Sequence, residues 1–117
     1  MIRDLFPLFV KDSHIVNISS MGGYQGSAKF PGLSVYSAAK GAVAVLSECL
    51  AEEFKEQGIK VNALAIGAVQ TEMLSQAFPG YMAPLQPDEM AEFIMDFALN
   101  GHRFFNGKIL PVSVSTP

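Results

Sequence analysis

An α/β fold with three parallel strands and crossover helices is predicted for this chain by the order of its segments. Helical and strand-like patterns alternate as helix, strand, helix, strand, helix, strand. Such alternation is typical of parallel sheets, in which helices cross over the sheet to join neighbouring strands. The 117 residues suffice for a single domain spanning residues 1–117, and half of them are hydrophobic while 16% are charged. That composition provides a rich core.

The first segments lead from the end of a helix through a strand into a loop. Residues 2–10 resemble the last turns of a helix, in which Pro7 is poorly placed. Residues 14–19 are a β-branched run typical of a buried strand. A long loop follows, and its turns are marked by Gly22, Gly23, Gly26, Pro31 and Gly32.

A long helix is predicted over residues 34–57, with Gly58 where a C-terminal cap belongs. Before the charged last turns of this helix, only Lys40 and Glu48 carry charge, and apolar residues occur all round it. A helix that is apolar on every side is buried on every side. We therefore expect one face to pack on the sheet and the other on a second subunit. Cys49 is expected to be a buried, unreactive thiol.

Two strands and one helix complete the pattern. Residues 60–66 are predicted to form the second strand. Residues 72–86 are interrupted by prolines and are predicted to form a partly helical, mobile segment. A helix is predicted from Pro87 to Gly101, with acidic residues in its first turn. The third strand is predicted over residues 108–114, and Pro111 within it indicates an edge position.

The overall composition argues against several classes of partner. The net charge of −3 argues against nucleic acid or an anionic membrane surface. No apolar run approaches the ~18 residues needed to span a bilayer, and the first residues do not resemble a signal peptide. Cys49 is the only cysteine, which excludes an internal disulfide and suits a reducing compartment. His14 and His102 lack metal-ligand spacing, so we expect a cytoplasmic protein without a metal site.

Tyr36 and Lys40 are the residues that most clearly suggest chemistry. They are four positions apart and lie on one face of the predicted helix. A phenol beside an ammonium group loses its proton more easily, because the cation favours the phenolate. Ser19 and Ser20, which close the first strand, bring hydroxyl groups that can share a substrate oxygen with the phenol. This set predicts a proton-transfer site, although a Tyr–Lys pair alone also arises on helices by chance.

Three segments in this order resemble one family. They are IVNISS at residues 15–20, YSAAKG at residues 36–41 and VNALAIGAVQTEM at residues 61–73. In sequence and spacing they resemble the short-chain dehydrogenase/reductase family, and specifically the C-terminal half of its classical members. The resemblance extends roughly from Leu5 to Val114. It implies a partial Rossmann-like parallel sheet that lacks the N-terminal dinucleotide-binding half.

The resemblance also implies an activity and roles for residues. The family interconverts small-molecule carbonyls and alcohols with NAD or NADP. By resemblance, Tyr36 is the general acid in reduction and the base in oxidation. Lys40 eases proton loss from Tyr36 and binds the nicotinamide ribose. Ser20 binds the substrate oxygen, with Ser19 as the alternative.

A loop after the second strand is the implied nicotinamide site. There Gly67 allows close approach of the backbone, the Val69 main chain meets the carboxamide and the Thr71 hydroxyl contacts the cofactor. Ile66 departs from the proline usual in the family, and the interval of 16 positions from Ser20 to Tyr36 is longer than usual. Read alone, Thr71 fits a helix cap and Gly67 a turn. Either a substrate pocket or ordinary packing accounts for four further residues, Met73, Phe78, Tyr81 and Met82.

The dinucleotide-binding half of the family has no counterpart in this sequence. The sequence contains no Gly-rich dinucleotide loop, so a bound pyrophosphate would lack an anion site. The family's catalytic asparagine falls before Met1. We therefore expect a truncated portion of an oxidoreductase that is inactive alone. The alternative is a non-enzymatic fragment that acts as a self-associating or interaction module. Because the strand at 14–19 is left with an open edge, we expect a homo-oligomer with strands paired or exchanged across subunits.

Overall fold

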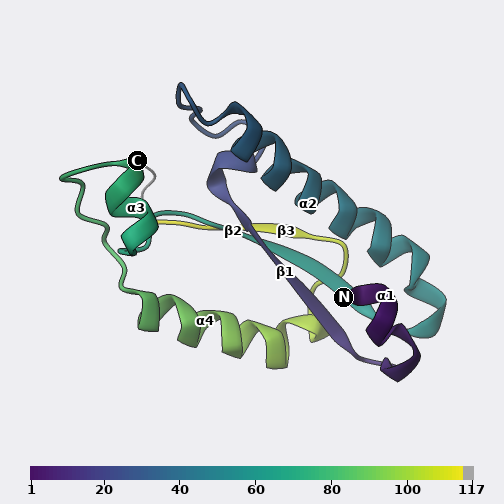
Figure 1. The fold of residues 1–117 in the computed structure, drawn as a ribbon. Helices are drawn as coiled ribbons and strands as arrows, with labels where there is room; N and C mark the ends of the chain where they lie inside the picture. The colour runs from purple at the N-terminus through teal and green to yellow at the C-terminus, as the bar shows by residue number, and fades with distance from the viewer. Residues whose placement is uncertain (115–117) are drawn as a thin grey trace.

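A computed structural model of the chain describes residues 1–114 and confirms the α/β fold with three parallel strands (Figure 1). The strands lie in the order β1-β2-β3. In chain order the elements are α1 (Ile2–Leu5), η1 (Phe6–Leu8), β1 (His14–Ser20), η2 (Met21–Gly23), α2 (Ser34–Glu53), η3 (Lys55–Gln57), β2 (Lys60–Ile66), α3 (Glu72–Ala77), α4 (Pro87–Asn100), η4 (Gly101–Arg103) and β3 (Ile109–Val112), where η denotes a 3₁₀ turn.

The two long helices cover opposite faces of the sheet (Figure 1). Successive side chains of a strand point to opposite faces, and β1 shows this directly. Asn17 donates to the Ser47 hydroxyl on α2 at 2.9 Å, whereas His14 bonds to the Ala98 carbonyl on α4 at 3.1 Å. The central strand is therefore covered on both faces, and its residues Val61, Asn62, Ala63, Leu64 and Ala65 are buried.

Several predicted boundaries are confirmed by local geometry. Gly58 adopts the left-handed conformation, with φ of 75°, after α2 and a short 3₁₀ turn, and this conformation suits glycine. Pro87 begins α4 behind a capping box formed by Gln86 and Glu89. Pro111 lies in β3, which is an edge strand as predicted. The segment at 72–86 is partly helical, because it contains α3.

The N-terminal segment differs from the prediction. A helix was predicted through residue 10, but α1 ends at Leu5. The 3₁₀ turn η1 follows it, with Pro7 near the start of that turn. Proline lacks the N–H that an α-helix interior requires, so the helix changes type there. β3 is also shorter than predicted and ends at Val112.

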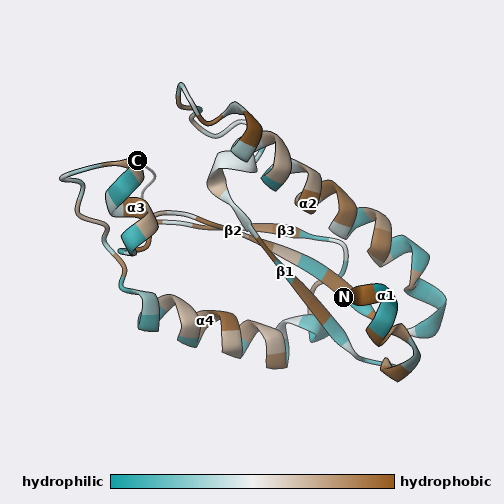
Figure 2. Ribbon diagram, in the orientation of Figure 1, coloured by the Kyte–Doolittle hydropathy of each residue, from teal (hydrophilic) through white to brown (hydrophobic). Residues whose placement is uncertain are grey.

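Burial of α2 is one-sided within residues 1–114, which agrees with the expected packing of one face on the sheet but corrects the expected burial of Cys49. The buried residues Ala44, Ser47 and Ala51 face the sheet, whereas Val45 and Leu46 are exposed. Cys49 is also exposed rather than buried in the core. The reason is that, within residues 1–114, nothing covers the outer face of α2. Figure 2 shows that hydrophobic residues recur along this helix, and the exposed ones include Val35, Val45 and Leu46.

A polar cluster joins the strands at their amino-terminal ends. The fully buried Asn62 side chain bonds to His14 Nε2 at 2.9 Å and to the Phe105 carbonyl at 3.0 Å, and it accepts from the Lys108 N–H at 3.0 Å. Since a carbonyl only accepts, His14 Nδ1 carries the proton given to Ala98, and Nε2 accepts from Asn62. This arrangement requires a neutral imidazole.

Stability is therefore expected to fall in mild acid. Burial lowers the pKa of His14 below 6.5, nearby His102 and Lys60 lower it further, and the bond to the Ala98 carbonyl opposes them. The unfolded chain then binds a proton more readily than the folded chain, so the free energy of unfolding decreases as pH falls below 6.5. Urea unfolding between pH about 7.5 and about 5 measures this. The His14→Gln variant should show a flatter dependence, and an equally steep one would contradict this assignment.

Candidate active site

The two serines that end β1 have different surroundings. Ser19 is only 2% exposed, and its hydroxyl donates to the Lys40 carbonyl at 2.7 Å. Ser20 instead accepts from the Gly22 N–H at 3.0 Å, which leaves its hydroxyl hydrogen able to donate. Ser19 thus ties the strand to α2. Ser20, and not the alternative Ser19, presents a hydroxyl suited to binding a substrate oxygen.

The turn after β1 packs directly on the backbone of α2. A Cβ atom at Gly23 would stand 2.4 Å from the Gly41 nitrogen and 2.6 Å from the Lys40 carbonyl carbon. Only glycine permits this approach. The contact places η2, and with it Ser20, against the turn of helix that carries Tyr36 and Lys40. Sequence reasoning used Gly23 only as a loop marker and missed this role.

Ser20 and Tyr36 both border Gly22. A Cβ atom at Gly22 would lie 3.4 Å from Ser20 Oγ and 3.4 Å from Tyr36 Cε1. Lys40 Nζ lies over the Tyr36 ring, 5.8 Å from its centroid. The tyrosine is 39% exposed, so the three side chains from β1 and α2 gather at a surface that solvent can reach.

The segment after β2 begins at the carboxyl ends of the strands, as this group does. Ser20 is the register partner of Ile66, and Ile66 is that of Val112. Gly67 continues the ladder, because its N–H donates to the Val112 carbonyl at 2.9 Å. The carboxyl ends of parallel strands are where such sheets bind ligands.

The remaining predicted site residues lie beyond Gly67. Val69 forms an isolated bridge with Leu85. Thr71 is the N-cap of α3, since its hydroxyl accepts from the Leu74 N–H at 3.2 Å. The reading of Thr71 as a helix cap is therefore confirmed, and accepting this bond leaves its hydroxyl hydrogen free to donate elsewhere.

The four candidate pocket residues are not gathered into one group. Met73 and Met82 are exposed, whereas the Phe78 ring packs edge-to-face on Phe30 with centroids 5.2 Å apart. Phe30 belongs to the loop before α2, so this contact joins the segments that follow β1 and β2. The backbone N–H of Tyr81 donates to the Phe78 carbonyl at 3.1 Å. None of the motifs identified in the sequence pointed to Phe30.

Residues 1–114 hold neither a metal-binding cluster nor a membrane-spanning helix. No group of three or more His, Cys, Asp or Glu side chains within residues 1–114 is arranged to hold a metal ion. Over the same residues, none of the helices combines the length and apolar character needed to cross a bilayer.

A sequence model of the short chain dehydrogenases matches residues 1–81, which include Ser20, Tyr36, Lys40 and the segment after β2. The chain belongs to the short-chain dehydrogenase family. The predicted resemblance and the Rossmann-like character of the sheet are thereby confirmed.

Named relatives of this short-chain dehydrogenase act on small carbonyl or alcohol compounds. A diacetyl reductase that forms (S)-acetoin in Staphylococcus aureus is 41% identical over 72 residues, which are 62% of this chain and 27% of that protein. The crystal structure of the acetoin dehydrogenase YohF from Salmonella typhimurium matches with a TM-score of 0.66 and 33% identity, over 86% of this chain and 41% of that one. An actinorhodin polyketide ketoreductase variant with NADPH matches with a TM-score of 0.68 and 28% identity, over 87% and 46%.

The chain spans less than half the length of the curated relatives that it matches. Four of them are covered over 44%, 37%, 36% and 42% of their own length.

Proposed function

We propose that this short-chain dehydrogenase chain is the catalytic portion of an oxidoreductase that interconverts a carbonyl and an alcohol with NAD or NADP. The observation that supports this most strongly is that Ser20 Oγ and the Tyr36 ring both border the space at Gly22, with the Lys40 ammonium group over the ring. The names of the relatives point to the same chemistry, because diacetyl and acetoin differ by one carbonyl reduction.

The side chains of this chain supply the proton and stabilise charge on the substrate oxygen. In the direction of reduction, the Tyr36 hydroxyl donates its proton to that oxygen, and in oxidation its phenolate removes the proton. The Lys40 ammonium group lies over the same ring, 5.8 Å from its centroid, at the side where the cofactor ribose would bind. The Ser20 hydroxyl donates a hydrogen bond to the oxygen as negative charge develops there.

The residues present fit the nicotinamide end of the cofactor. Within residues 1–114 the one ion pair joins Lys55 and Glu52, so Lys40 keeps its charge available for a ribose hydroxyl. Gly67, Val69 and Thr71 follow β2 at the same edge of the sheet, where main-chain groups and the Thr71 hydroxyl would hold the nicotinamide. When bound, the nicotinamide supplies or accepts the hydride.

Cofactor affinity of the 117-residue chain alone is expected to be too low to measure. The chain holds groups for the nicotinamide end but contains no Gly-rich turn for the pyrophosphate, which normally supplies a large part of the binding. Calorimetric titration with NADH and NADPH should therefore show no heat of binding up to about millimolar cofactor, a free energy of about −4 kcal/mol. Micromolar binding would contradict the proposal that the chain is inactive alone.

Activity is expected once a phosphate-binding part is supplied. A suitable fusion places the residues of the Salmonella acetoin dehydrogenase that precede its counterpart of Met1 ahead of this chain, and we call it the fused enzyme. It should oxidise NADH or NADPH in the presence of small ketones and diketones. A folded fused enzyme that binds cofactor but reduces none of a broad panel of carbonyl compounds would contradict the proposed function.

Self-association through α2 is the quaternary arrangement that we propose. Exposed small or apolar residues recur on this helix at alternating intervals of three and four, a spacing that forms a seam between helices. They are Val35, Ala38, Ala42, Val45 and Cys49. The exposed, free thiol of Cys49 also suits the reducing cytoplasm, where we propose that the protein resides.

Light scattering is expected to find a dimer that Val45→Glu converts to a monomer, because the substitution puts a charge into the seam. A wild-type chain that is folded and monomeric at high concentration would rule out this arrangement.

A further inference from the structure

One tripeptide occurs twice in the chain, once on each segment that contributes to the candidate active site. Phe-Pro-Gly stands at residues 30–32, in the loop before α2, and again at residues 78–80, directly after α3. The first copy lies between Ser20 and Tyr36, and the second follows Thr71. The two copies therefore belong to the two segments that the proposed reaction brings together.

Both copies form the same tight turn. In each copy the N–H of the residue after the glycine donates to the phenylalanine carbonyl, at 3.3 Å for Phe30 and 3.1 Å for Phe78. Gly32 and Gly80 have φ of 87° and 83°. Proline at the second position and a glycine with positive φ at the third are typical of a type II turn. Each turn thus fixes the backbone next to its phenylalanine.

The two phenylalanines at the start of these turns pack against each other. The Phe30 and Phe78 rings meet edge-to-face, with an interplanar angle of 75° and centroids 5.2 Å apart, which is a favourable arrangement for aromatic rings. In Figure 1 the loop before α2 and the segment after α3 both lie beyond the carboxyl ends of β1 and β2. The contact thus joins these two segments outside the sheet, and we call Phe30 and Phe78 the aromatic clasp.

A closed loop holds Phe30 in its place. Lys29 Nζ donates to the Tyr24 carbonyl at 3.0 Å and to the Ser27 carbonyl and hydroxyl at 2.9 and 2.7 Å, which occupies all three donors of the ammonium group. The Ser27 N–H donates to the Tyr24 carbonyl, and the Tyr24 N–H donates to the Met21 carbonyl, both at 3.1 Å. Phe30 is therefore positioned from the η2 side by this loop and from the α2 side by its own turn.

The aromatic clasp lies within reach of a substrate held by Tyr36. A turn brings its first and fourth Cα atoms within about 7 Å, and the fourth residue of the first turn is Leu33, the N-cap of α2. Tyr36 stands three residues further along, a rise of about 5 Å. The Cα atoms of Phe30 and Tyr36 are therefore no more than about 12 Å apart, a span that a small substrate and two side chains fill.

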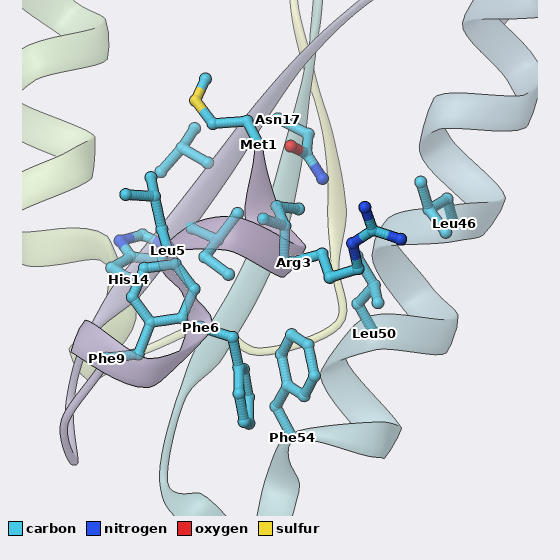
Figure 3. A pocket seen from close by; sticks show the side chains of 13 residues that line it. Met1, Arg3, Leu5, Phe6, Phe9, His14, Asn17, Leu46, Leu50 and Phe54 are labelled. Carbon is cyan, nitrogen blue, oxygen red and sulfur yellow. The ribbon is translucent and has the colours of Figure 1, made fainter.

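Two hollows beside α2 lie away from Tyr36. One has a volume of about 890 Å³, and Figure 3 shows Phe6 and Phe54 among its lining residues. The other lies between η2, α2 and the start of β3. Neither lining includes Tyr36, so a substrate held there must find apolar contacts elsewhere. Phe30 and Phe78 are half-buried, and part of each side chain remains available to it.

We propose that the aromatic clasp bounds the space for the group attached to the reacting carbonyl, and that it restricts the enzyme to carbonyl compounds with small substituents. A long or branched substituent would have to part the Phe30 and Phe78 rings and so lose their edge-to-face contact. The inference rests on the proposed function for the reaction, whereas the contact itself belongs to the structure of the chain.

Limited trypsin digestion of the 117-residue chain tests the contact without any substrate. The bond after Lys29 lies beside the aromatic clasp, and its cleavage requires the loop to open. Phe78→Ala, on the other segment, should speed this cleavage at least about threefold, because loss of an aromatic contact raises the open fraction. The matched control is Phe104→Ala, since Phe104 is 73% exposed and follows η4. It should leave the rate unchanged, and circular dichroism should show both variants folded.

Kinetics of the fused enzyme test the size limit. The ratio of kcat/KM for diacetyl to kcat/KM for its analogue with a phenyl group in place of one methyl group measures how strongly size is restricted. Phe30→Ala and Phe78→Ala should each lower this ratio at least about tenfold. The double variant should lower it little further, because removal of either ring opens the clasp. Phe104→Ala should keep the ratio of the unsubstituted enzyme.

The outcomes separate this inference from the proposed function. Active Phe30→Ala and Phe78→Ala enzymes with an unchanged ratio, or with equal losses of kcat/KM for both substrates, overturn the size limit and leave the proposed function standing. Trypsin cleavage after Lys29 that Phe78→Ala does not accelerate overturns the clasp. A fused enzyme that binds cofactor but reduces no carbonyl compound overturns the proposed function and the size limit with it, and the trypsin result then decides on the clasp alone.

Discussion

Replacing Tyr36 by phenylalanine should lower kcat of the fused enzyme by about 10³-fold, the usual contribution of a general acid or base. The substitution removes only the hydroxyl group that exchanges the proton with the substrate oxygen. The ring beneath Lys40 stays in place, so cofactor affinity should change little. Steady-state kinetics and calorimetric cofactor titration of the same preparation measure the two effects.

Tyr24→Phe is the matched control for this experiment. Tyr24 also loses only a hydroxyl group, and it follows the η2 turn and lines a hollow whose lining includes neither Ser20 nor Tyr36. Its kcat should equal that of the unsubstituted enzyme. Turnover retained in Tyr36→Phe, or an equal loss in both variants, would refute the assignment of Tyr36 as the proton donor.

Gly23→Ala should produce the second large effect, a loss of both stability and activity. The added Cβ would meet the Gly41 nitrogen at 2.4 Å and the Lys40 carbonyl carbon at 2.6 Å, and backbone atoms cannot move aside as a side-chain tip can. Such overpacking costs about 1–3 kcal/mol or more. The η2 turn must lift from α2, which carries Ser20 away from Tyr36. Chemical unfolding and kcat of the fused enzyme measure the two losses.

The neighbouring Gly22→Ala substitution separates activity from stability. Here the Cβ would make ordinary contacts of 3.4–3.6 Å with Ser20, Tyr36 and Ser37, so the free energy of unfolding should change by less than about 1 kcal/mol. The methyl group nevertheless fills the space between the Ser20 hydroxyl and the Tyr36 ring, so kcat should fall. If Gly22→Ala were fully active, the space at Gly22 could not be where the substrate oxygen binds.

The strands and the long helices were predictable because their signals are local. A β-branched run, a glycine after a helix and a proline at a helix start each dictate a backbone conformation regardless of the rest of the fold. For this reason β1, β2, the Gly58 cap and the start of α4 agree with the prediction within a residue or two. The motif around Tyr36 and Lys40 was recognisable because both residues lie on one helix.

Features that depend on contacts between distant segments were not predictable. The prediction that Cys49 is buried was wrong, because it assumed that another segment covers the outer face of α2. The choice between Ser19 and Ser20 needed the bond from Ser19 to the Lys40 carbonyl, 21 positions along the chain. The contact of Gly23 with α2 likewise joins two segments that the sequence does not relate.

The central claim is that Ser20 and Tyr36 act as one unit on a single substrate oxygen. A double-mutant cycle in the fused enzyme, with Ser20→Ala, Tyr36→Phe and the double variant compared by kcat/KM, measures this directly. Groups that act together lose most of their effect when either is removed. The double variant should therefore be scarcely worse than Tyr36→Phe alone. Losses that multiply fully, as for independent residues, would contradict the account.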